Sequence, residues 1–299
     1  MKQTEQSRAE LRSMRCDLHT HSVFSDGTYT PTELIAEARR LGLILALTDH
    51  NTAAGLPEFM EAARKQGVTA VPGVEFSTEY NGKELHLLGL FVFPEHYATV
   101  ERMVKEQHVL KEISNMELVE RLNQAGYLID YMKVKRRNLN GNANRAHIAA
   151  ELLEQGYVTS VREAFDTLLN PKNGFYVPPS RLQLMDVIAE LRRIGVLPVL
   201  AHPLQELTEP ELRELLPSAI AAGLAGMETM HSSYPPETIA LAEKIAAEFR
   251  LLPSGGSDFH GSIKPDISLG TGKGELCIPH KIYLDLLNVR NSIASGGSK

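Results

Sequence analysis

The most informative part of the chain lies near the N-terminus and reads Cys16-Asp17-Leu18-His19-Thr20-His21-Ser22-Val23-Phe24-Ser25-Asp26-Gly27. A β-strand directs side chains i and i+2 to the same face, so we expect His19 and His21 to project together. Asp26 follows in a serine- and glycine-rich loop. Two neutral imidazoles on one face form half of a divalent-metal site, and two surface histidines on an edge strand are the alternative. The choice depends on how many similar strand ends follow.

Helices and strands alternate along most of the chain. Thr30, Pro31 and Glu33 form a capping box with proline at the first helical position, which predicts a helix at about 31–41. The apolar run 43–47 is typical of a buried parallel strand. By the same reasoning we expect strands at 69–74, 84–92, 196–200, 225–230 and 251–254, and helices at 56–66, 182–194, 209–222, 236–249 and 280–292. The pattern predicts an α/β fold, most simply an incomplete (β/α) barrel of about seven strands.

The alternation is interrupted between about 94 and 180. This segment holds a long helical pattern, a basic, asparagine-rich stretch and two shorter helices, expected at 95–123, 133–144, 145–155 and 161–169. We interpret it as a helical insertion, or cap, over the main domain. We expect a flexible N-terminal tail at 1–15. The barrel is expected in two segments, 16–93 and 181–295, with the cap between them at 94–180.

The composition is typical of a globular protein, with 299 residues of which 43% are hydrophobic and 23% charged. The sequence has no apolar run of the ~20 residues needed to cross a membrane, and its polar first 15 residues do not resemble a signal peptide. The net charge of −6 argues against bulk electrostatic capture of nucleic acid. Cys16 and Cys277 are too few for a disulfide framework, which favours a cytoplasmic protein.

Potential metal ligands gather at the predicted strand ends. Nine of them lie at or just beyond the carboxyl end of a strand: His19, His21, Asp26, His50, Glu75, His202, His231, Asp258 and His260. In a barrel these ends share the face on which active sites are built. His86 lies early in its strand, which indicates a strand of opposite sense or an altered closure. Each residue alone has an ordinary structural explanation, but the whole set favours two or three divalent ions bound by nitrogen and oxygen.

These residues resemble a known family. The segments Asp17-Leu18-His19-Thr20-His21, Thr48-Asp49-His50, Glu75, His86, Ala201-His202-Pro203 and Gly256-Ser257-Asp258-Phe259-His260 resemble the PHP (polymerase and histidinol phosphatase) family. The resemblance implies a distorted (β/α)7 barrel with a trinuclear centre that hydrolyses phosphate esters. The expected ions are Mn²⁺, with Fe²⁺ or Zn²⁺ as alternatives. A hydroxide shared between two of the ions is the expected nucleophile.

The resemblance also implies a role for each residue. One ion is assigned to His19, His21, Glu75 and Asp258, a second to Glu75, His86 and His202, and a third to Asp26, His50 and His260. Glu75 bridges the first two ions. Asp17 and Asp49 are expected to orient neighbouring imidazoles. His231 is a candidate catalytic acid or substrate contact, or alternatively the ligand that replaces His202.

The insertion points to a substrate class. Its segments Asn144-Arg145-Ala146-His147-Ile148-Ala149 and Tyr176-Val177-Pro178 resemble the subgroup that acts on nucleotides, either 3′,5′-nucleoside bisphosphates or the 5′ end of RNA. The resemblance assigns Arg145 to a substrate phosphate and makes His147 a second substrate-binding candidate. The basic stretch 131–140 has no assigned role.

Three other functions fit parts of the pattern. A C–N amidohydrolase also uses a His-x-His barrel, but such enzymes often carry a carbamylated strand lysine, and the predicted strands contain no lysine. A histidinol-phosphate phosphatase would share the metal site without the nucleotide-type cap. A non-catalytic PHP module would have a decayed site, whereas the ligand set here is intact.

Overall fold

The computed structural model describes residues 15–137 and 143–296. The predicted tail at 1–15 lies outside the described residues, except for Arg15, which begins the first strand. Residues 138–140 of the basic stretch also lie outside them.

The described strands form a single sheet. Their bounds are β1 Arg15–Asp17, β2 Leu43–Leu47, β3 Ala70–Tyr80, β4 Lys83–Leu90, β5 Leu182–Gln183, β6 Leu197–Leu200, β7 Gly226–His231, β8 Leu252–Gly256 and β9 Ile278–Pro279. The order is β8-β7-β6-β4-β3-β2-β1-β9, and β5 pairs with β3. Strand β2 reads Leu-Ile-Leu-Ala-Leu and is buried throughout, as expected for a strand covered on both faces.

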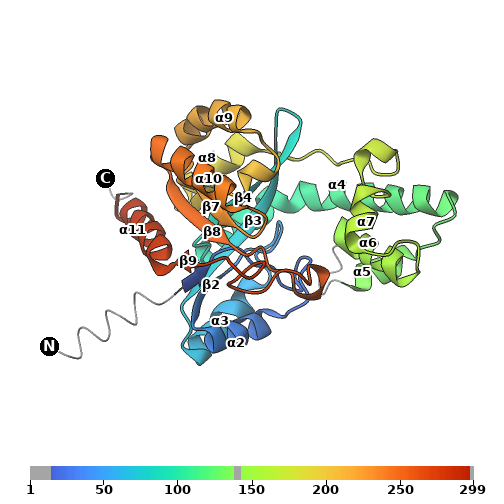
Figure 1. The fold of residues 1–299 in the computed structure, drawn as a ribbon, viewed down its shortest axis with the longest axis horizontal. Coiled ribbons are helices and arrows are strands. Elements are labelled where there is room, and N and C mark those ends of the chain that lie inside the picture. The colour runs from blue at the N-terminus through green and yellow to red at the C-terminus, as the bar shows by residue number, and fades with distance from the viewer. Residues whose placement is uncertain (1–14, 138–142, 297–299) are drawn as a thin grey trace.

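The sheet closes between β1 and β8. Beyond β1, the N–H of Leu18 donates to the carbonyl of Gly255 at 3.1 Å. The N–H of Asp258 donates to the carbonyl of His19 at 2.9 Å, and the N–H of His21 donates to the carbonyl of Phe259 at the same distance. The seven strands from β8 to β1 therefore form a nearly closed barrel, as the sequence predicts (Figure 1).

Strand β4 runs antiparallel to both of its neighbours, β3 and β6. This confirms the opposite sense inferred from His86. The predicted end of β3 at 74 is wrong, because residues 75–80 continue the strand and pair with β4 as a hairpin. Glu75 therefore lies within β3, and His86 pairs with Ser77 two residues further on.

Helices surround the barrel, with bounds α2 Pro31–Leu41, α3 Leu56–Gln66, α8 Leu184–Arg193, α9 Glu209–Ala222, α10 Pro236–Glu248 and α11 His280–Gly296. The predicted capping box at Thr30 is present, and Gly42 ends α2 in the left-handed conformation at φ 65°. Figure 1 shows α8, α9 and α10 on one side of the barrel and α2 and α3 on the other. Within the described ranges, every helix is too short or too polar to cross a membrane.

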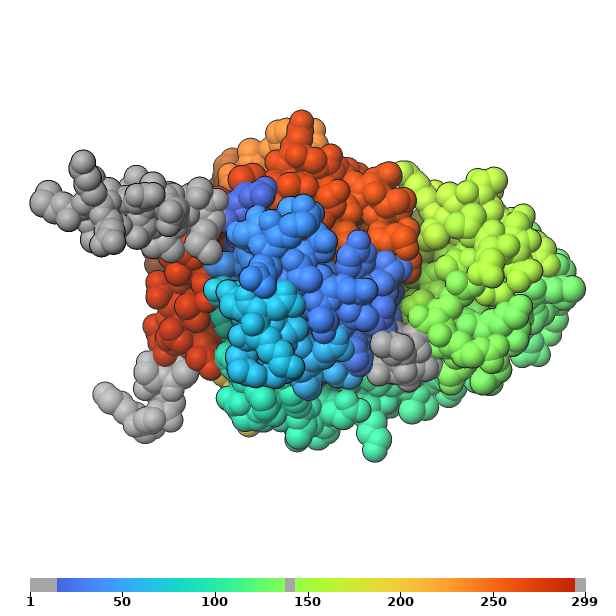
Figure 2. Space-filling view, turned by 90° about the horizontal axis from the view of Figure 1, so that it is seen from below, coloured from blue at the N-terminus to red at the C-terminus, as the bar shows by residue number. Residues whose placement is uncertain are grey.

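The helical insertion comprises α4 Tyr97–Gln124, α5 Tyr131–Arg136, α6 Arg145–Glu154 and α7 Val161–Asp166. Helix α4 joins two cores, because Val104 packs with the barrel and Leu118 packs with Ile148 and Leu152 of α6. The cap formed by the far end of α4 and by α5, α6 and α7 lies at one end of the molecule (Figures 1 and 2). The sequence pattern did not predict α5.

Candidate metal centre and substrate cavity

Glu75 lies at the centre of the barrel mouth with only 1% of its surface exposed. Five imidazole nitrogens lie within 3.2 Å of its oxygens, those of His19, His21, His50, His86 and His202. The first three face Oε2 and the last two face Oε1. The two oxygens of one carboxylate thus face separate groups of imidazoles, which is the arrangement needed to bridge two cations.

Two further carboxylates complete the cluster. Asp26 Oδ1 lies 3.3 Å from Nε2 of His260, and Asp26 Oδ2 lies 3.8 Å from Nε2 of His50. Asp258 Oδ1 lies 3.3 Å from Nε2 of His21 and 3.4 Å from Nδ1 of His260. The structure therefore brings together the nine residues that the resemblance assigns to the three ions, His86 among them.

The cluster fits divalent cations. Potential ligand atoms lie within 4.8 Å of one another in three groups: His21, Asp26, His50 and His260; His19, His21 and Glu75; and His50, Glu75 and His86. Several buried atoms make no hydrogen bond within the described chain, namely Asp26 Oδ1, His50 Nδ1, Glu75 Oε2 and His202 Nδ1. A buried polar atom without a partner costs ~1–3 kcal/mol, so these atoms need a partner from outside the chain. Nitrogen and oxygen ligands without thiolate suit Mn²⁺, Fe²⁺ or Zn²⁺.

The protonation states of the cluster agree with this interpretation. Burial alone would raise the pKa of Glu75, but the imidazoles of His19 and His86 hold that pKa well below its usual range. Burial lowers the pKa of His50 to about 3, so its ring stays neutral and keeps the lone pair that a ligand needs. Burial would also lower the pKa of His86, but Glu75 raises it to about 10. In the absence of a metal ion, a proton on His86 therefore compensates the negative charge of Glu75.

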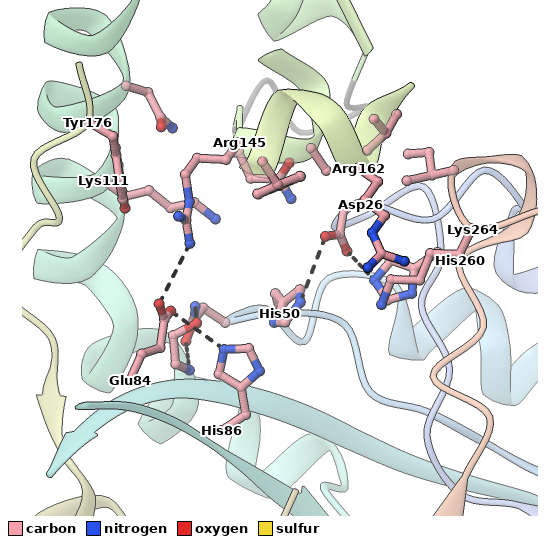
Figure 3. Close-up of a pocket in the computed structure, with 18 of the residues that line it drawn as sticks. Asp26, His50, Glu84, His86, Lys111, Arg145, Arg162, Tyr176, His260 and Lys264 are labelled. Carbon is pink, nitrogen blue, oxygen red and sulfur yellow. Dashed lines mark hydrogen bonds and ion pairs between the residues drawn. The ribbon is translucent and has the colours of Figure 1, made fainter. Parts of the chain in front are cut away.

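A cavity of about 710 Å³ lies between the barrel mouth and the cap, lined in part by Asp26, His50 and His86 (Figure 3). Arg145 at the start of α6 points into it. Its guanidinium carbon lies 4.3 Å from the ring centroid of Tyr176, and its Nη2 lies 3.6 Å from Oε2 of Glu84. Arg145 is therefore held over an aromatic ring and is not a freely solvated helix end.

The model of the PHP domain family matches residues 17–177. The chain belongs to this family. Together with the relatives below, this establishes the PHP protein as a metal-dependent phosphoric ester hydrolase and confirms the resemblance in the sequence.

Several PHP relatives are similar over most of their length. A 5′-3′ exoribonuclease of Haemophilus influenzae is 33% identical over 82% of this chain and 89% of its own. A phosphoribosyl 1,2-cyclic phosphate 1,2-diphosphodiesterase of Eggerthella lenta is 32% identical over 82% and 94%. A 3′,5′-nucleoside bisphosphate phosphatase of Chromobacterium violaceum is 31% identical over 82% and 86%. A solved Bifidobacterium adolescentis structure, assigned as a metal-dependent phosphoesterase, has a TM-score of 0.82 at 31% identity, covering 92% of this chain and 96% of its own.

Glu228 of β7 is a carboxylate of the PHP site that the sequence analysis missed. Its Oε1 lies 3.1 Å from Nδ1 of His19, and its Oε2 accepts a 2.8 Å hydrogen bond from the N–H of His202. The side chain is fully buried, and burial would raise its pKa, but the charge of His19 lowers it. A carboxylate behind an imidazole fixes the tautomer and direction of the ring. A glutamate within a buried strand, three residues before His231, was the available signal.

The contacts of Asp17 differ from those predicted. Its Oδ1 accepts a hydrogen bond from the N–H of Ser257 at 2.8 Å. Its Oδ2 accepts from the Ser257 hydroxyl at 2.6 Å and from the N–H of Gly270 at 2.8 Å. Asp17 thus fixes the loop that follows β8 and carries Asp258, while Glu228 contacts the imidazole.

Asp49 also acts on a loop. Its oxygens accept hydrogen bonds from the Ser22 N–H at 2.8 Å and from the Ser25 hydroxyl at 2.5 Å. Ser25 Oγ lies 3.3 Å from Nδ1 of His21. Asp49 therefore reaches an imidazole only through a serine, because the turn after His21 brings the hydroxyl between them.

The surroundings of His231 define its tautomer. The backbone N–H of Ser233 lies 3.2 Å from Nδ1, and the Gln205 amide lies 3.0 Å from the same atom. Nδ1 must accept the hydrogen bond from a backbone N–H, so the hydrogen of the neutral ring lies on Nε2. Nε2 lies 3.7 Å from Oδ2 of Asp258. His231 can therefore donate to a substrate oxygen, whereas His202, with Nε2 3.2 Å from Glu75, fits the ligand position better.

His147 occupies a structural position. Its Nδ1 accepts a 3.1 Å hydrogen bond from the N–H of Asn144, and Asn144 Oδ1 accepts one from the N–H of His147. The ring is 3% exposed and completes a capping box at the start of α6. Its contacts thus differ from the predicted contact with substrate, and they hold the turn that presents Arg145.

The described part of the basic stretch 131–140 forms α5 and its C-cap. Lys135 Nζ lies 2.7 Å from Glu112, and Arg137 Nη2 lies 2.6 Å from Glu151. These cations are bound to acidic residues of the cap itself, so they stabilise the cap rather than the cavity.

The sequence pattern singles out only Arg145 among the cations that line the cavity, and it does not mark Arg181, Lys111 and Lys264, for example. Arg181 Nη2 lies 2.6 Å from Glu84 Oε2, beside Arg145. Lys111 of α4 lines the same side, and burial lowers its pKa. Lys264 Nζ lies 2.6 Å from Oδ2 of Asp258. Nothing in their local sequence marks them, because only the fold brings them to the cavity.

Proposed function

We propose that this PHP protein hydrolyses phosphate esters of nucleotides, namely 3′,5′-nucleoside bisphosphates or short RNA with a 5′ phosphate. The observation that carries the proposal is the single cavity in which Asp26, His50 and His260 face Arg145 of the cap. It offers one position for a phosphate at the barrel mouth and a second, cationic position for another phosphate. The exoribonuclease and bisphosphate phosphatase among the relatives support this substrate class by their names.

We propose that three cations, Mn²⁺ in the first instance, bind the cluster. Their ligands are His19, His21, Glu75 and Asp258; Glu75, His86 and His202; and Asp26, His50 and His260. The opposite directions of the two Glu75 oxygens support its bridging role. Such ions supply a water of lowered pKa and positive charge for the phosphate oxygens.

The protein itself orients the substrate. Arg145 offers two parallel N–H groups to the phosphate that does not react, and Tyr176 holds the guanidinium in place. Arg181 and Lys111 add charge beside it, so three cations face the single carboxylate of Glu84. The excess positive charge matches the −1.5 to −2 of a terminal phosphate at neutral pH. At the reacting phosphate, Nε2–H of His231 donates a hydrogen bond to an oxygen.

The test is a hydrolysis screen of the Mn²⁺-loaded protein. It compares a 3′,5′-nucleoside bisphosphate, a 5′-phosphorylated short RNA, a nucleoside monophosphate, an aryl phosphate, a 1,2-cyclic phosphate and histidinol phosphate. We expect kcat/KM for the first two to exceed the aryl phosphate value by about 30-fold or more, the equivalent of one charged contact. A preference for the cyclic phosphate or histidinol phosphate would contradict the proposal. We also propose a cytoplasmic location, which the free cysteines Cys16 and Cys277 support.

A further inference from the structure

We propose that a second cationic group of the cavity, Arg162, Lys264 and Lys273, binds the phosphodiester chain of single-stranded RNA beyond the phosphate that reacts. We call these three residues the distal wall. The inference rests on the proposed function and extends it, because it assigns the position of the RNA chain that a bisphosphate lacks.

Arg162 and Lys264 lie across the cavity from Arg145, and Lys273 lines the same cavity. Arg162 is on α7 of the cap, while Lys264 and Lys273 belong to the segment between β8 and β9. In Figure 3, Arg145 and Lys111 lie on one side of His50, and Arg162 and Lys264 lie on the other side beside His260. Figure 2 shows that the same segment of the barrel meets the cap. A substrate whose reacting phosphate sits at the barrel mouth therefore meets cations in both directions.

The charge of the cavity is unlike that of the chain. Six cationic side chains line it, namely Lys111, Arg145, Arg162, Arg181, Lys264 and Lys273. Three carboxylates line it, namely Asp26, Glu84 and Asp266. The chain as a whole carries −6, so the positive charge is concentrated where the substrate binds. This is the electrostatic pattern of a site for a polyanion.

Two cations of the distal wall, Arg162 and Lys273, are available to a ligand. Arg162 has 91% of its side chain exposed, and its contact with Asp166 is a 3.6 Å exposed pair of the kind that contributes little. Lys273 is also exposed. Lys264 contacts Oδ2 of Asp258, while Oδ1 of the same carboxylate faces His19 and His21. Lys264 is thus paired with Asp258 and adds positive charge to the wall, whereas Arg162 and Lys273 are the members free to contact a phosphodiester.

One substrate orientation accounts for both substrate classes. With the 5′ phosphate at Arg145, water adds to the phosphorus on the 3′ side, the bond from phosphorus to the 3′ oxygen breaks, and that oxygen takes the proton. In a bisphosphate this phosphorus ends the molecule, and the distal wall stays unused. In RNA the same phosphorus carries the next nucleotide, whose own 3′ phosphate extends toward Arg162 and Lys273.

The experiment compares two substrates on the Mn²⁺-loaded full chain, a 3′,5′-nucleoside bisphosphate and a 5′-phosphorylated tetraribonucleotide. The variants are Arg162→Gln and Lys273→Gln, both at exposed positions where folding is not at risk. The matched control is Lys172→Gln, which removes an exposed cation of the same insertion away from the cavity lining. Each protein is measured at 50 and 200 mM salt.

We expect the ratio of kcat/KM for the tetranucleotide to kcat/KM for the bisphosphate to fall about five-fold in each cavity variant. The dependence of log kcat/KM on log salt should become shallower by about 0.7 for the tetranucleotide, as for one lost contact to a single strand. Lys172→Gln should keep the wild-type ratio and slope. Equal ratios in the wild type and all three variants would contradict the proposed role of the distal wall. Hydrolysis of the bisphosphate without the tetranucleotide would also overturn it and leave the proposed function intact, whereas hydrolysis of neither would refute both.

Discussion

The barrel mouth and the cap wall of the cavity are built in different ways. At the barrel mouth, His19, Glu75 and Glu228 are at most 1% exposed and are held by closely packed strands of one sheet. In the cap, Arg145 keeps 26% of its side chain exposed and depends on one helix start and the ring of Tyr176. The residues proposed for chemistry and those proposed for substrate recognition are therefore held by separate parts of the molecule. Changes at the barrel mouth should affect every substrate, and changes in the cap should affect the choice among substrates.

The largest effect is expected for Glu75→Gln. The amide removes the charge that five imidazoles surround and leaves one oxygen where two face the proposed ions. We expect loss of bound metal and at least ~10²-fold lower kcat on all substrates, because the nucleophile and charge compensation depend on the ions. Metal analysis and steady-state kinetics measure both quantities. Glu79→Gln, four residues further along β3, is the matched control and should retain its metal. Full metal content with near-normal kcat in Glu75→Gln would refute the bridging role.

The next effect separates the cap from the barrel. We expect Arg145→Ala to cost about 2–4 kcal/mol in kcat/KM on bisphosphates, as for a charged contact to phosphate. The loss should include kcat, since binding energy from a remote phosphate can act at the reacting phosphorus. Arg136→Ala, an exposed arginine of α5, is the control. Equal losses on a bisphosphate and on an aryl phosphate would mean that Arg145 serves the reacting phosphate, and the contrast between the regions would fail.

Glu228→Gln tests whether metal binding depends on the carboxylate that contacts the imidazole of His19. The amide can still accept the hydrogen bond from the N–H of His202, but the charge beside His19 is lost. We expect metal affinity to fall about 10–100-fold, with kcat recovering as metal is added in excess. Titration of the metal-free protein with Mn²⁺ measures the affinity. A variant that binds Mn²⁺ as tightly as the wild type would show that Glu228 only fills space.

The smallest effect concerns His147 and the stability of the cap. Burial lowers the pKa of His147 from 6.5 to about 4, so the unfolded chain binds a proton that the folded cap excludes. Its contribution to stability is complete above about pH 6.5 and is lost as the pH falls toward about 4, by at most ~1.4 kcal/mol per pH unit. His147→Gln keeps a side chain suited to the capping box without this titration. Urea unfolding of both proteins at pH 7.5 and pH 5 should show that only the wild type loses this increment, and an equal loss in both would assign the pH dependence elsewhere.

The sequence was most informative where the signal is local. The capping box at Thr30 and Glu33 predicts α2 correctly, and α9 spans the predicted 209–222. The alternation of apolar strands with helices predicts the barrel, and His86 at the start of its strand predicts the antiparallel β4. The prediction of β3 stopped at 74 because the polar residues of its hairpin with β4 lack the apolar pattern of a buried strand.

The kinds and spacing of the potential ligands follow from local sequence, since the backbone itself sets the directions of His-x-His just beyond β1 and of a carboxylate after a strand. The groups that support these ligands come from distant parts of the chain. Glu228 reaches His19 from 209 residues away, and Asp17 reaches Ser257 across 240 residues. Arg181 and Lys264 likewise enter the cavity through contacts across the fold. A local pattern specifies the direction of a side chain relative to its own strand or helix. The partner of that side chain depends on how the barrel closes and how the cap lies across the barrel, because these determine which distant residues meet.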